Sequence, residues 1–293
     1  MLTLTHVSKT YPGNVRALQD ISLEIPRGLF GLLGPNGAGK SSLMRTVATL
    51  QAPDAGSVQF AGFDVFADRM RLRRTLGYLP QEFGAYPGTS ALSMLKHLAT
   101  LKGLQGQSRE TTVEDLLHKT NLWEVRNQSV DKFSGGMKQR FGIAQALLGD
   151  PKLLIVDEPT AGLDPAERRR FQNLLVQVGE EVVVILSTHI VDDVEDICSN
   201  VAIMGQGRIL LQGEPAALIR HLEGKLWKTL VPAQEVATMR ASHTVISTRL
   251  KSGATEVRVT ADAQPPGMTA VQPTLEDIYF STLIASGLTE NLE

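Results

Sequence analysis

A glycine-rich run at residues 34–41, Gly-Pro-Asn-Gly-Ala-Gly-Lys-Ser, constrains the fold more than any other feature of this chain of 293 residues. It matches in full the phosphate-binding pattern GxxxxGK followed by Ser or Thr, which works only as a turn between a strand and a helix. An apolar run at 29–33 precedes it, and apolar residues at helical spacing follow at 43–50. A simple glycine-rich turn is therefore disfavoured, and the run predicts a parallel α/β core.

The residue types in this loop suit the binding of a nucleoside triphosphate and a magnesium ion. Glycines allow successive backbone N–H groups to point inward as an anion-binding nest, and the N-terminus of the following helix adds positive potential. Lys40 is expected to reach the β- and γ-phosphates and to act in catalysis, and the Ser41 hydroxyl is expected to bind Mg²⁺. The predicted cofactor-binding residues of the loop are Gly34, Pro35, Asn36, Gly37, Ala38, Gly39, Lys40, Ser41 and Ser42.

An acidic pair follows a short apolar run at 153–156, which is typical of a parallel strand buried on both faces. Asp157 ends this strand and is placed to hold Mg²⁺ directly or through water. Glu158 comes one residue later, points in another direction, and could orient or deprotonate the attacking water. Two acidic residues that open a loop would be the simpler interpretation, but the phosphate-binding loop in the same chain favours the metal and water roles.

Residues Ser134, Gly135 and Gly136 precede a predicted helix, with apolar side chains at helical spacing over 137–148. Ser134 could simply cap that helix. The same cap could instead be a second γ-phosphate site, because the N-terminus of a helix favours an anion. The two interpretations are compatible.

Four further residues indicate a functional site only as a set. Gln81 follows a strand-like run, Asp164 lies in a turn before a helix, and His189 ends a strand predicted at 182–188. The end of that strand lies at the edge where open α/β sheets bind ligands. Tyr11 presents an aromatic face, which can accept a base without hydrogen-bond readout, although it could also be a core or surface tyrosine. Taken singly, Gln81 is more often a solvated residue and His189 a structural one.

The phosphate-binding loop, the Ser-Gly-Gly run and the Asp-Glu pair, with Tyr11, Gln81, Asp164 and His189 in the family's order, resemble the nucleotide-binding subunit of an ABC transporter over about residues 1–220. The resemblance implies ATP and Mg²⁺ as cofactors and ATP hydrolysis as the activity. It also implies that Tyr11 stacks on adenine and that His189 is the γ-phosphate switch. Gln81 would contact Mg²⁺ or water and report the nucleotide state. Asp164 would belong to a loop that couples two sites.

One motif departs from the family's usual signature, LSGGQ, since Phe133 stands for the leucine and Met137 for the glutamine. The resemblance implies that Ser134, Gly135 and Gly136 still contact a phosphate, held by the phosphate-binding loop of the opposite subunit. It does not extend to the contact that the glutamine side chain normally makes. A second nucleotide-binding subunit, in a homodimer, is therefore implied as one partner.

Composition bears on the remaining partners. The formal net charge is −2, so no electrostatic attraction to nucleic acid is expected. Cys198 is the only cysteine, which excludes an intrachain disulfide. No apolar run approaches the roughly 18 residues that cross a bilayer, and Met1–His6 lacks the charged and apolar regions of a signal peptide. The resemblance then implies a separate integral membrane permease, which would hold the chain at the cytoplasmic face of the cell membrane.

The organisation follows from these landmarks. An ABC ATP-binding domain is expected at 1–220: a P-loop NTPase core with an antiparallel β lobe and an inserted helical subdomain at about 82–140, which begins with a link at 82–89. Residues 221–293 predict a small C-terminal α+β domain. This tail, with its run Pro273–Tyr279, resembles that of drug-resistance-type (ABC-2) exporter ATPases, which indicates an exporter.

Two other classes of protein remain as alternatives. A soluble ABC ATPase of DNA repair or translation would carry a coiled-coil insertion or two nucleotide cassettes, and neither pattern is seen in this sequence. A regulatory module that holds nucleotide without turning it over is disfavoured by Glu158 and His189. An ATPase assay would separate these classes.

Overall fold

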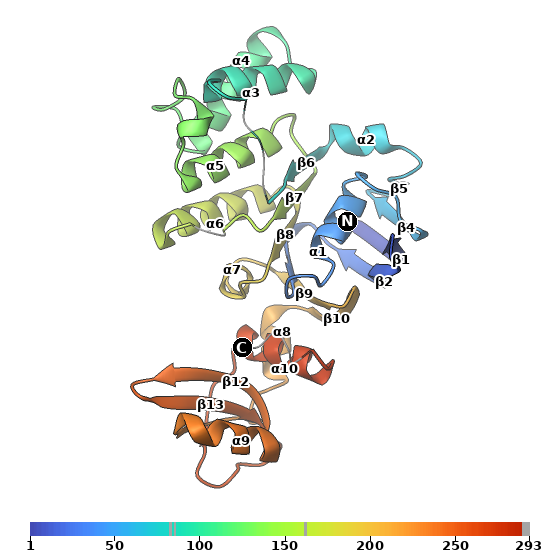
Figure 1. Ribbon diagram of the computed structural model, residues 1–293. Coiled ribbons are helices and arrows are strands. Elements are labelled where there is room, and N and C mark those ends of the chain that lie inside the picture. The colour runs from blue at the N-terminus through green and yellow to red at the C-terminus, as the bar shows by residue number, and fades with distance from the viewer. Residues whose placement is uncertain (82–83, 85, 161–162, 289–293) are drawn as a thin grey trace.

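The structure, a computed structural model, describes residues 1–81, 84, 86–160 and 163–288. Its centre is a six-stranded sheet of order β10-β9-β3-β8-β7-β6 (Figure 1). β10 is antiparallel to β9, and the other neighbours run parallel. The strands are β3 (Gly28–Leu33), β6 (Leu76–Leu79), β7 (Leu153–Asp157), β8 (Val183–Thr188), β9 (Asn200–Gly205) and β10 (Arg208–Gly213). β7 and β8 are buried along their whole length, as parallel strands covered on both faces should be.

A smaller antiparallel sheet and one helix cover one face of the central sheet. The strand order of this smaller sheet is β2-β1-β4-β5. The elements are β1 (Leu2–Tyr11), β2 (Val15–Ile25), β4 (Ala55–Phe60), β5 (Phe63–Asp64), α1 (Lys40–Val47) and the adjoining α2 (Arg69–Arg74). Leu4, Phe30 and Met44 come from β1, β3 and α1 and lie in one buried cluster. This packing brings the end of β1 close to the start of α1.

A helical insertion lies at one end of the molecule (Figure 1). It comprises α3 (Ala91–Leu101), α4 (Gly106–Lys119), the 3₁₀ turn η1 (Val130–Lys132) and α5 (Gly135–Ala146). Leu95, Leu117 and Phe141 represent its own buried cluster. Residues 82, 83 and 85 of the predicted link lie outside the described residues.

Helices α6 (Pro165–Gly179), α7 (Asp192–Glu195), α8 (Pro215–Arg220) and α10 (Leu275–Ala285) cover the other face of the central sheet. α10 lies beyond position 220, where the sequence predicts a domain boundary. Nevertheless its Ile278 and Leu283 are buried in the same cluster as Leu33 and Ile203 of the central sheet. The boundary stays a prediction, and the last helix shares the core of the ATP-binding half.

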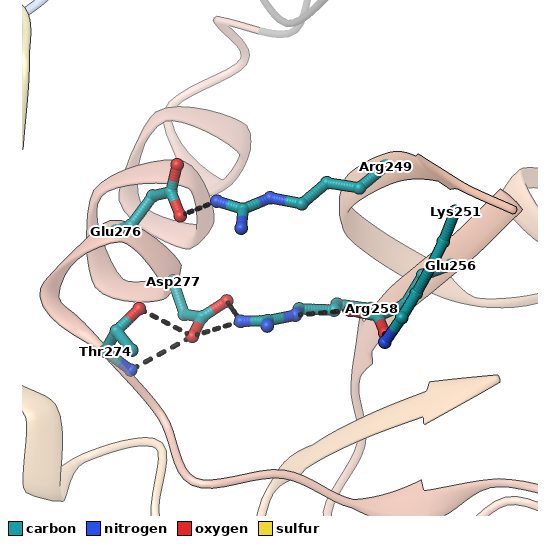
Figure 2. A network of polar contacts seen from close by, with 7 residues as sticks. All are labelled: Arg249, Lys251, Glu256, Arg258, Thr274, Glu276 and Asp277. Atoms are coloured by element: carbon teal, nitrogen blue, oxygen red, sulfur yellow. Dashed lines mark hydrogen bonds and ion pairs between the residues drawn. The ribbon is translucent and has the colours of Figure 1, made fainter.

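Between α8 and α10 the chain forms a third sheet, of order β12-β13-β11-β14, with α9 packed against it. Its elements are β11 (Leu226–Val231), η2 (Ala233–Glu235), α9 (Val236–Ser242), β12 (Thr244–Lys251), β13 (Ala254–Thr260) and β14 (Thr269–Ala270). Figure 2 shows how this sheet holds α10. Arg258 donates to both carboxylate oxygens of Asp277 at 3.0 Å, and Arg249 pairs with Glu276.

The predicted α/β architecture is confirmed, with its antiparallel lobe, its helical insertion and its α+β C-terminal part. The sequence did not predict strands β5, β9, β10, β11 and β14 or helices α7, α8 and α9. Over the described ranges, every helix is either too short or too polar to span a bilayer.

Candidate active site

The phosphate-binding loop lies between β3 and α1, where the sequence predicts it. Gly39, which precedes α1, has a φ of 106°, a left-handed conformation that favours glycine. A Cβ atom at Gly34 would come within 2.4 Å of the Met204 carbonyl oxygen. Glycine is therefore required at both ends of the loop. No side chain caps the start of α1, so its first N–H groups keep their capacity to bind an anion.

Lys40 is the first residue of α1, and its side chain is only 5% exposed. The ammonium Nζ donates to the carbonyl oxygens of Gly34 and Pro35, at 2.7 and 3.1 Å. Burial lowers the pKa of Lys40, and the negative charge of Glu158, 3.6 Å from Nζ, acts in the opposite direction. The loop thus folds back on its own lysine and presents a cation at its centre.

A cavity of about 490 Å³ opens beside this loop. That volume is within the usual range for small-molecule sites. Its lining consists of Tyr11, Val15, Arg16, Ala17, the loop residues Asn36, Gly37, Ala38, Gly39, Lys40, Ser41 and Ser42, and Gln81 and Glu158. The cavity therefore collects predicted site residues from β1, the phosphate-binding loop, the end of β6 and the end of β7.

Tyr11 lies at the end of β1, opposite Val15 of β2. Its hydroxyl donates to Oε1 of Gln51 at 2.6 Å and lies 3.2 Å from Oγ of Ser42. These contacts hold the tyrosine ring against the start of α1. An aromatic ring that lines the cavity beside the phosphate-binding loop is suited to stacking on a base.

Glu158 is the point where the predicted catalytic residues meet. Gln81 donates from Nε2 to its Oε2 at 3.3 Å, and Nδ1 of His189 lies 3.4 Å from its Oε1. With Lys40 at 3.6 Å, three side chains face one carboxylate. Glu158 has a φ of 47°, in the left-handed region that a side chain other than glycine rarely adopts. Such strain is found where the surrounding structure fixes a functional group.

His189 follows β8 directly and is 43% exposed. It does not line the cavity beside Tyr11, but faces an adjoining one of about 460 Å³. Pro35 and Asn36 line this second cavity from the phosphate-binding loop, and Tyr279 and Phe280 line it from α10. The C-terminal helix therefore reaches the edge of the site.

Asp157 lies at the buried end of β7 and is 4% exposed. Its carboxylate accepts a hydrogen bond from Ser187 of β8, and its negative charge opposes the lowering of the Lys40 pKa that burial causes. It is not among the residues that line the cavity, whereas Ser41 and Gln81 are. In the described part of the chain, no cluster of three or more His, Cys, Asp or Glu residues could hold a metal ion by itself. This small number of protein ligands is compatible with Mg²⁺, because that ion is usually held by one or two carboxylates together with phosphates and water.

Ser134, Gly135 and Gly136 lie on the helical insertion, and none of them lines the cavity. Ser134 caps α5, since its Oγ accepts from the Met137 N–H at 3.2 Å, as the simpler interpretation predicts. Ser134 and Gly135 are exposed, which leaves this helix start open to an outside group. One copy of the chain therefore does not bring the two predicted phosphate-binding elements into one cavity.

Asp164 also lies outside the cavity, at the exposed start of α6. Its Oδ1 accepts from the N–H groups of Ala166 and Glu167, both at 2.9 Å, so it caps this helix. Glu167 in turn pairs with Arg140 and packs against Gly136 of α5. The loop that carries Asp164 is thus linked mechanically to the Ser-Gly-Gly turn. Residues 161 and 162 of that loop lie outside the described residues.

Several residues of the site were not predicted from the sequence, among them Val15 and Ala17 of the cavity lining. Arg16 lines the cavity, Gln51 holds Tyr11, and Ser187 donates to Asp157. Arg16 carries a signal in hindsight, because it pairs with Thr10 beside Tyr11 in the β1–β2 hairpin. Gln51 and Ser187 carry none, since each is a common polar residue whose role depends on packing.

Fold and site together define a P-loop nucleotide-binding domain with a helical insertion. The family model described as ABC transporter matches residues 18–161. The Nod factor export ATP-binding protein I of Rhizobium etli is 36% identical over 228 residues, which are 76% of this chain and 71% of that protein. YhaQ of Bacillus subtilis, named an uncharacterized ABC transporter ATP-binding protein, is 35% identical, with 73% and 71% covered. The chain belongs to the ABC transporter ATP-binding proteins, as its sequence predicts.

A further relative and two solved structures agree with this family assignment. YbhF of Escherichia coli, named a probable multidrug ABC transporter ATP-binding protein, is 38% identical over 77% of this chain, which spans 39% of that relative. A solved ATP binding subunit of an ABC transporter superposes with a TM-score of 0.69 at 28% identity, covering 76% of this chain and 93% of that one. The dimeric bacterial cassette MJ0796 gives 0.67 at 26%, covering 73% and 98%. The predicted P-loop NTPase fold is confirmed, and the family agrees with the predicted ATPase class.

Proposed function

We propose that this chain binds ATP with Mg²⁺, hydrolyses it, and powers an exporter through a separate membrane permease. The observation that carries the proposal is the position of Glu158. Its carboxylate borders the cavity beside the phosphate-binding loop and faces Lys40, Gln81 and His189 within 3.6 Å. A carboxylate in that place is suited to act on water that attacks a bound phosphate.

Each predicted residue has a role in this proposal. ATP bound with Mg²⁺ would supply the γ-phosphoryl group and a divalent positive charge beside it. Ser41, Gln81 and Asp157 would hold the ion, and Lys40 would offset the charge of the β- and γ-phosphates. Glu158 would orient and deprotonate water, and His189 would hold the γ-phosphate. Catalysis would then rest on positioning and electrostatics, since phosphoryl transfer needs little else from the protein.

The proposed working unit is a pair of chains that closes face to face. Ser134, Gly135 and Gly136 are separate from the cavity of their own chain, and no side chain caps the start of α1, so its N–H groups can bind an anion. In a homodimer, the Ser-Gly-Gly turn of one chain would cover the γ-phosphate held by Lys40 of the other, with Asp164 coupling the two sites. The relative MJ0796 is described as dimeric, which supports this arrangement.

The names of relatives and the composition of the chain support an exporter with a membrane permease as partner. YbhF and the Nod factor protein carry names of a multidrug and an export system. Together with the net charge of −2, they favour a permease at the cytoplasmic face of the cell membrane over nucleic acid as partner. We also propose a division into an ATP-binding domain at residues 1–220 and a small C-terminal α+β domain at 221–293, whose last helix, α10, packs into the first domain.

The test compares the unaltered full chain with Glu158→Gln and with the control Glu181→Gln, whose carboxylate is 81% exposed. Glu158→Gln should lower the ATPase rate by at least about hundredfold yet still bind ATP, so that a nucleotide-bound dimer accumulates on size-exclusion chromatography. The control should behave as the unaltered chain. Wild-type turnover by Glu158→Gln would assign the base elsewhere, and no turnover by the unaltered chain, alone or with its permease, would refute the proposed function.

A further inference from the structure

Asp193 is a buried carboxylate for which the proposed chemistry has no use. It lies in α7, four residues after His189, and is 1% exposed. Removing a carboxylate from water is costly unless hydrogen bonds and opposite charges compensate. Its partners therefore indicate what the fold gains from placing it there.

The hydrogen bonds of Asp193 divide between its two oxygens. Oδ2 accepts from the hydroxyl of Thr160 and, at 3.1 Å, from the hydroxyl of Thr188. Oδ1 accepts from Nε of Arg168 at 2.6 Å and from Nε2 of Gln172 at 3.3 Å. Four donors converge on one side chain, and each of them points at an oxygen.

These donors belong to three segments that carry predicted site residues. Thr160 follows Glu158 by two positions, with the buried Pro159 between them. Thr188 directly precedes His189. The other two donors project from α6, whose first turn is capped by Asp164. A single carboxylate thus ties together the ends of β7 and β8 and the helix after the coupling loop.

The backbone at Glu158 explains why such a tie is needed. The φ of 47° costs about 1 kcal/mol or more for a residue with a side chain. A strained conformation persists only when the surroundings over-determine it. The Glu158 N–H donates to the Ser187 carbonyl oxygen at 3.0 Å, which fixes one side of the residue. On the other side of the residue, the Thr160 hydroxyl donates to Asp193.

We propose that Asp193 is a positioning residue for hydrolysis: it holds the Glu158 carboxylate and the His189 imidazole as one unit, through Thr160 and Thr188. This inference rests on the proposed function of the site. Asp193 borders neither cavity described above, so it acts through these residues. It should therefore govern turnover while leaving nucleotide affinity nearly unchanged.

The first experiment uses Asp193→Asn in the full chain. An amide cannot accept on both sides, so its NH₂ group must face either the two threonine hydroxyls or Arg168. We expect kcat to fall by about ten- to hundredfold, because a displacement of about 1 Å can cost that much. KM and the Kd for ATP should change less than about threefold. The matched control is Asp196→Asn, which removes the same charge from an exposed carboxylate three residues further on.

A second variant, Thr160→Val, keeps the side-chain size and removes one of the four donors. It should lower kcat in the same direction by a smaller factor. Urea unfolding of the same preparations shows whether Asp193→Asn folds. If it does not, Thr160→Val tests the same contact in a folded protein. Unchanged kcat in Thr160→Val, or in a folded Asp193→Asn, would overturn the proposal.

A double mutant distinguishes positioning from a general structural effect. If Asp193 acts by holding Glu158 and His189 as a unit, Asp193→Asn should change the residual rate of Glu158→Gln by less than about threefold, since residues that act as a unit are not additive. A full ten- to hundredfold further loss would show that Asp193 acts elsewhere and would overturn the proposal. The proposed function fails separately, if the unaltered chain does not hydrolyse ATP.

Discussion

The Lys40 ammonium lies 3.6 Å from the carboxylate of Glu158, and their side chains are only 5% and 12% exposed. Lys40 is predicted to bind phosphate, and Glu158 is predicted to act on water. Because water screens this pair poorly, each charge supports the other. Burial is nevertheless the larger influence on Lys40, whose pKa lies below the ordinary value for lysine.

This pair predicts a pH dependence of ATP affinity. Only the charged form of Lys40 attracts phosphate, and its lowered pKa means that the charge is lost at a lower pH than for an exposed lysine. Affinity should therefore weaken as pH rises, and the fall should begin at a lower pH than the ordinary pKa of an exposed lysine would give. Glu158→Gln removes an influence that raises the pKa of Lys40, so the fall should begin at a lower pH. Fluorescent-nucleotide titrations at several pH values measure the affinity of the unaltered chain and of Glu158→Gln.

Glu181→Gln serves as the control in the same titrations, since Glu181 is exposed and pairs with Arg27 instead. Its affinity profile should coincide with that of the unaltered chain. If Glu158→Gln gave the same profile too, the two charges would not interact across the cavity as this geometry requires.

The separation of Ser134 from the cavity predicts complementation between chains. Lys40→Ala should nearly abolish ATP hydrolysis, and Ser134→Ala should lower it by orders of magnitude, because each removes a stabilising contact from the γ-phosphate. A mixed dimer of the two variants has one site with both groups intact. Mixing should therefore restore activity, up to one site per mixed dimer.

The control for this experiment is each variant without the other. Mixing each variant only with itself, at the same total concentration, should give no recovery. A mixture of the two variants that stays inactive although mixed dimers form would argue that Ser134 serves the phosphate-binding loop of its own chain.

α10 predicts a stability effect far from the phosphate-binding loop in sequence. Ile278 is 3% exposed in the cluster that it shares with Leu33 and Ile203. Ile278→Ala should lower the free energy of unfolding by about 2–5 kcal/mol, since it removes buried apolar volume. Leu250→Ala, at a side chain that is 86% exposed, should change it by less than about 0.5 kcal/mol. Urea unfolding measures both, and equal values would contradict the packing of α10.

The two ion pairs side by side in Figure 2 should differ in strength. Arg258 and Asp277 are 16% and 2% exposed, and Arg258→Met would leave Asp277 buried with its charge uncompensated. Such a loss costs about 3–5 kcal/mol. Arg249 is 56% exposed, so Arg249→Met should cost under about 1 kcal/mol. A similar loss in both variants, measured by urea unfolding, would show that burial does not set the strength of these pairs.

Much of the site could be predicted because it depends on strand ends. Gln81, Glu158 and His189 each follow a parallel strand, and the carboxyl ends of parallel strands meet at one edge of a sheet. Glycine spacing then identifies the loop that completes the cavity. Local patterns suffice here, because the fold repeats a regular relation between sequence and position.

The rest depends on packing that no local pattern reports. Asp193 stands in the run Asp192-Asp193-Val194-Glu195, which reads as a solvated acidic turn, and only the tertiary fold buries it. The apolar face of 274–285 is visible in the sequence, but the surface that it covers is not. Periodicity shows that one face of the helix must be buried, but it does not identify the element against which that face packs.

The position of α10 has a consequence for how the protein is made. The face of the central sheet that α10 covers belongs to strands synthesised long before it, and the whole third sheet comes between. During translation that face of the central sheet remains exposed to water while the ribosome adds the residues of the third sheet. An unfinished chain would thus expose apolar surface prone to aggregation, and nascent chains that stop before α10 are the ones we expect chaperones to hold.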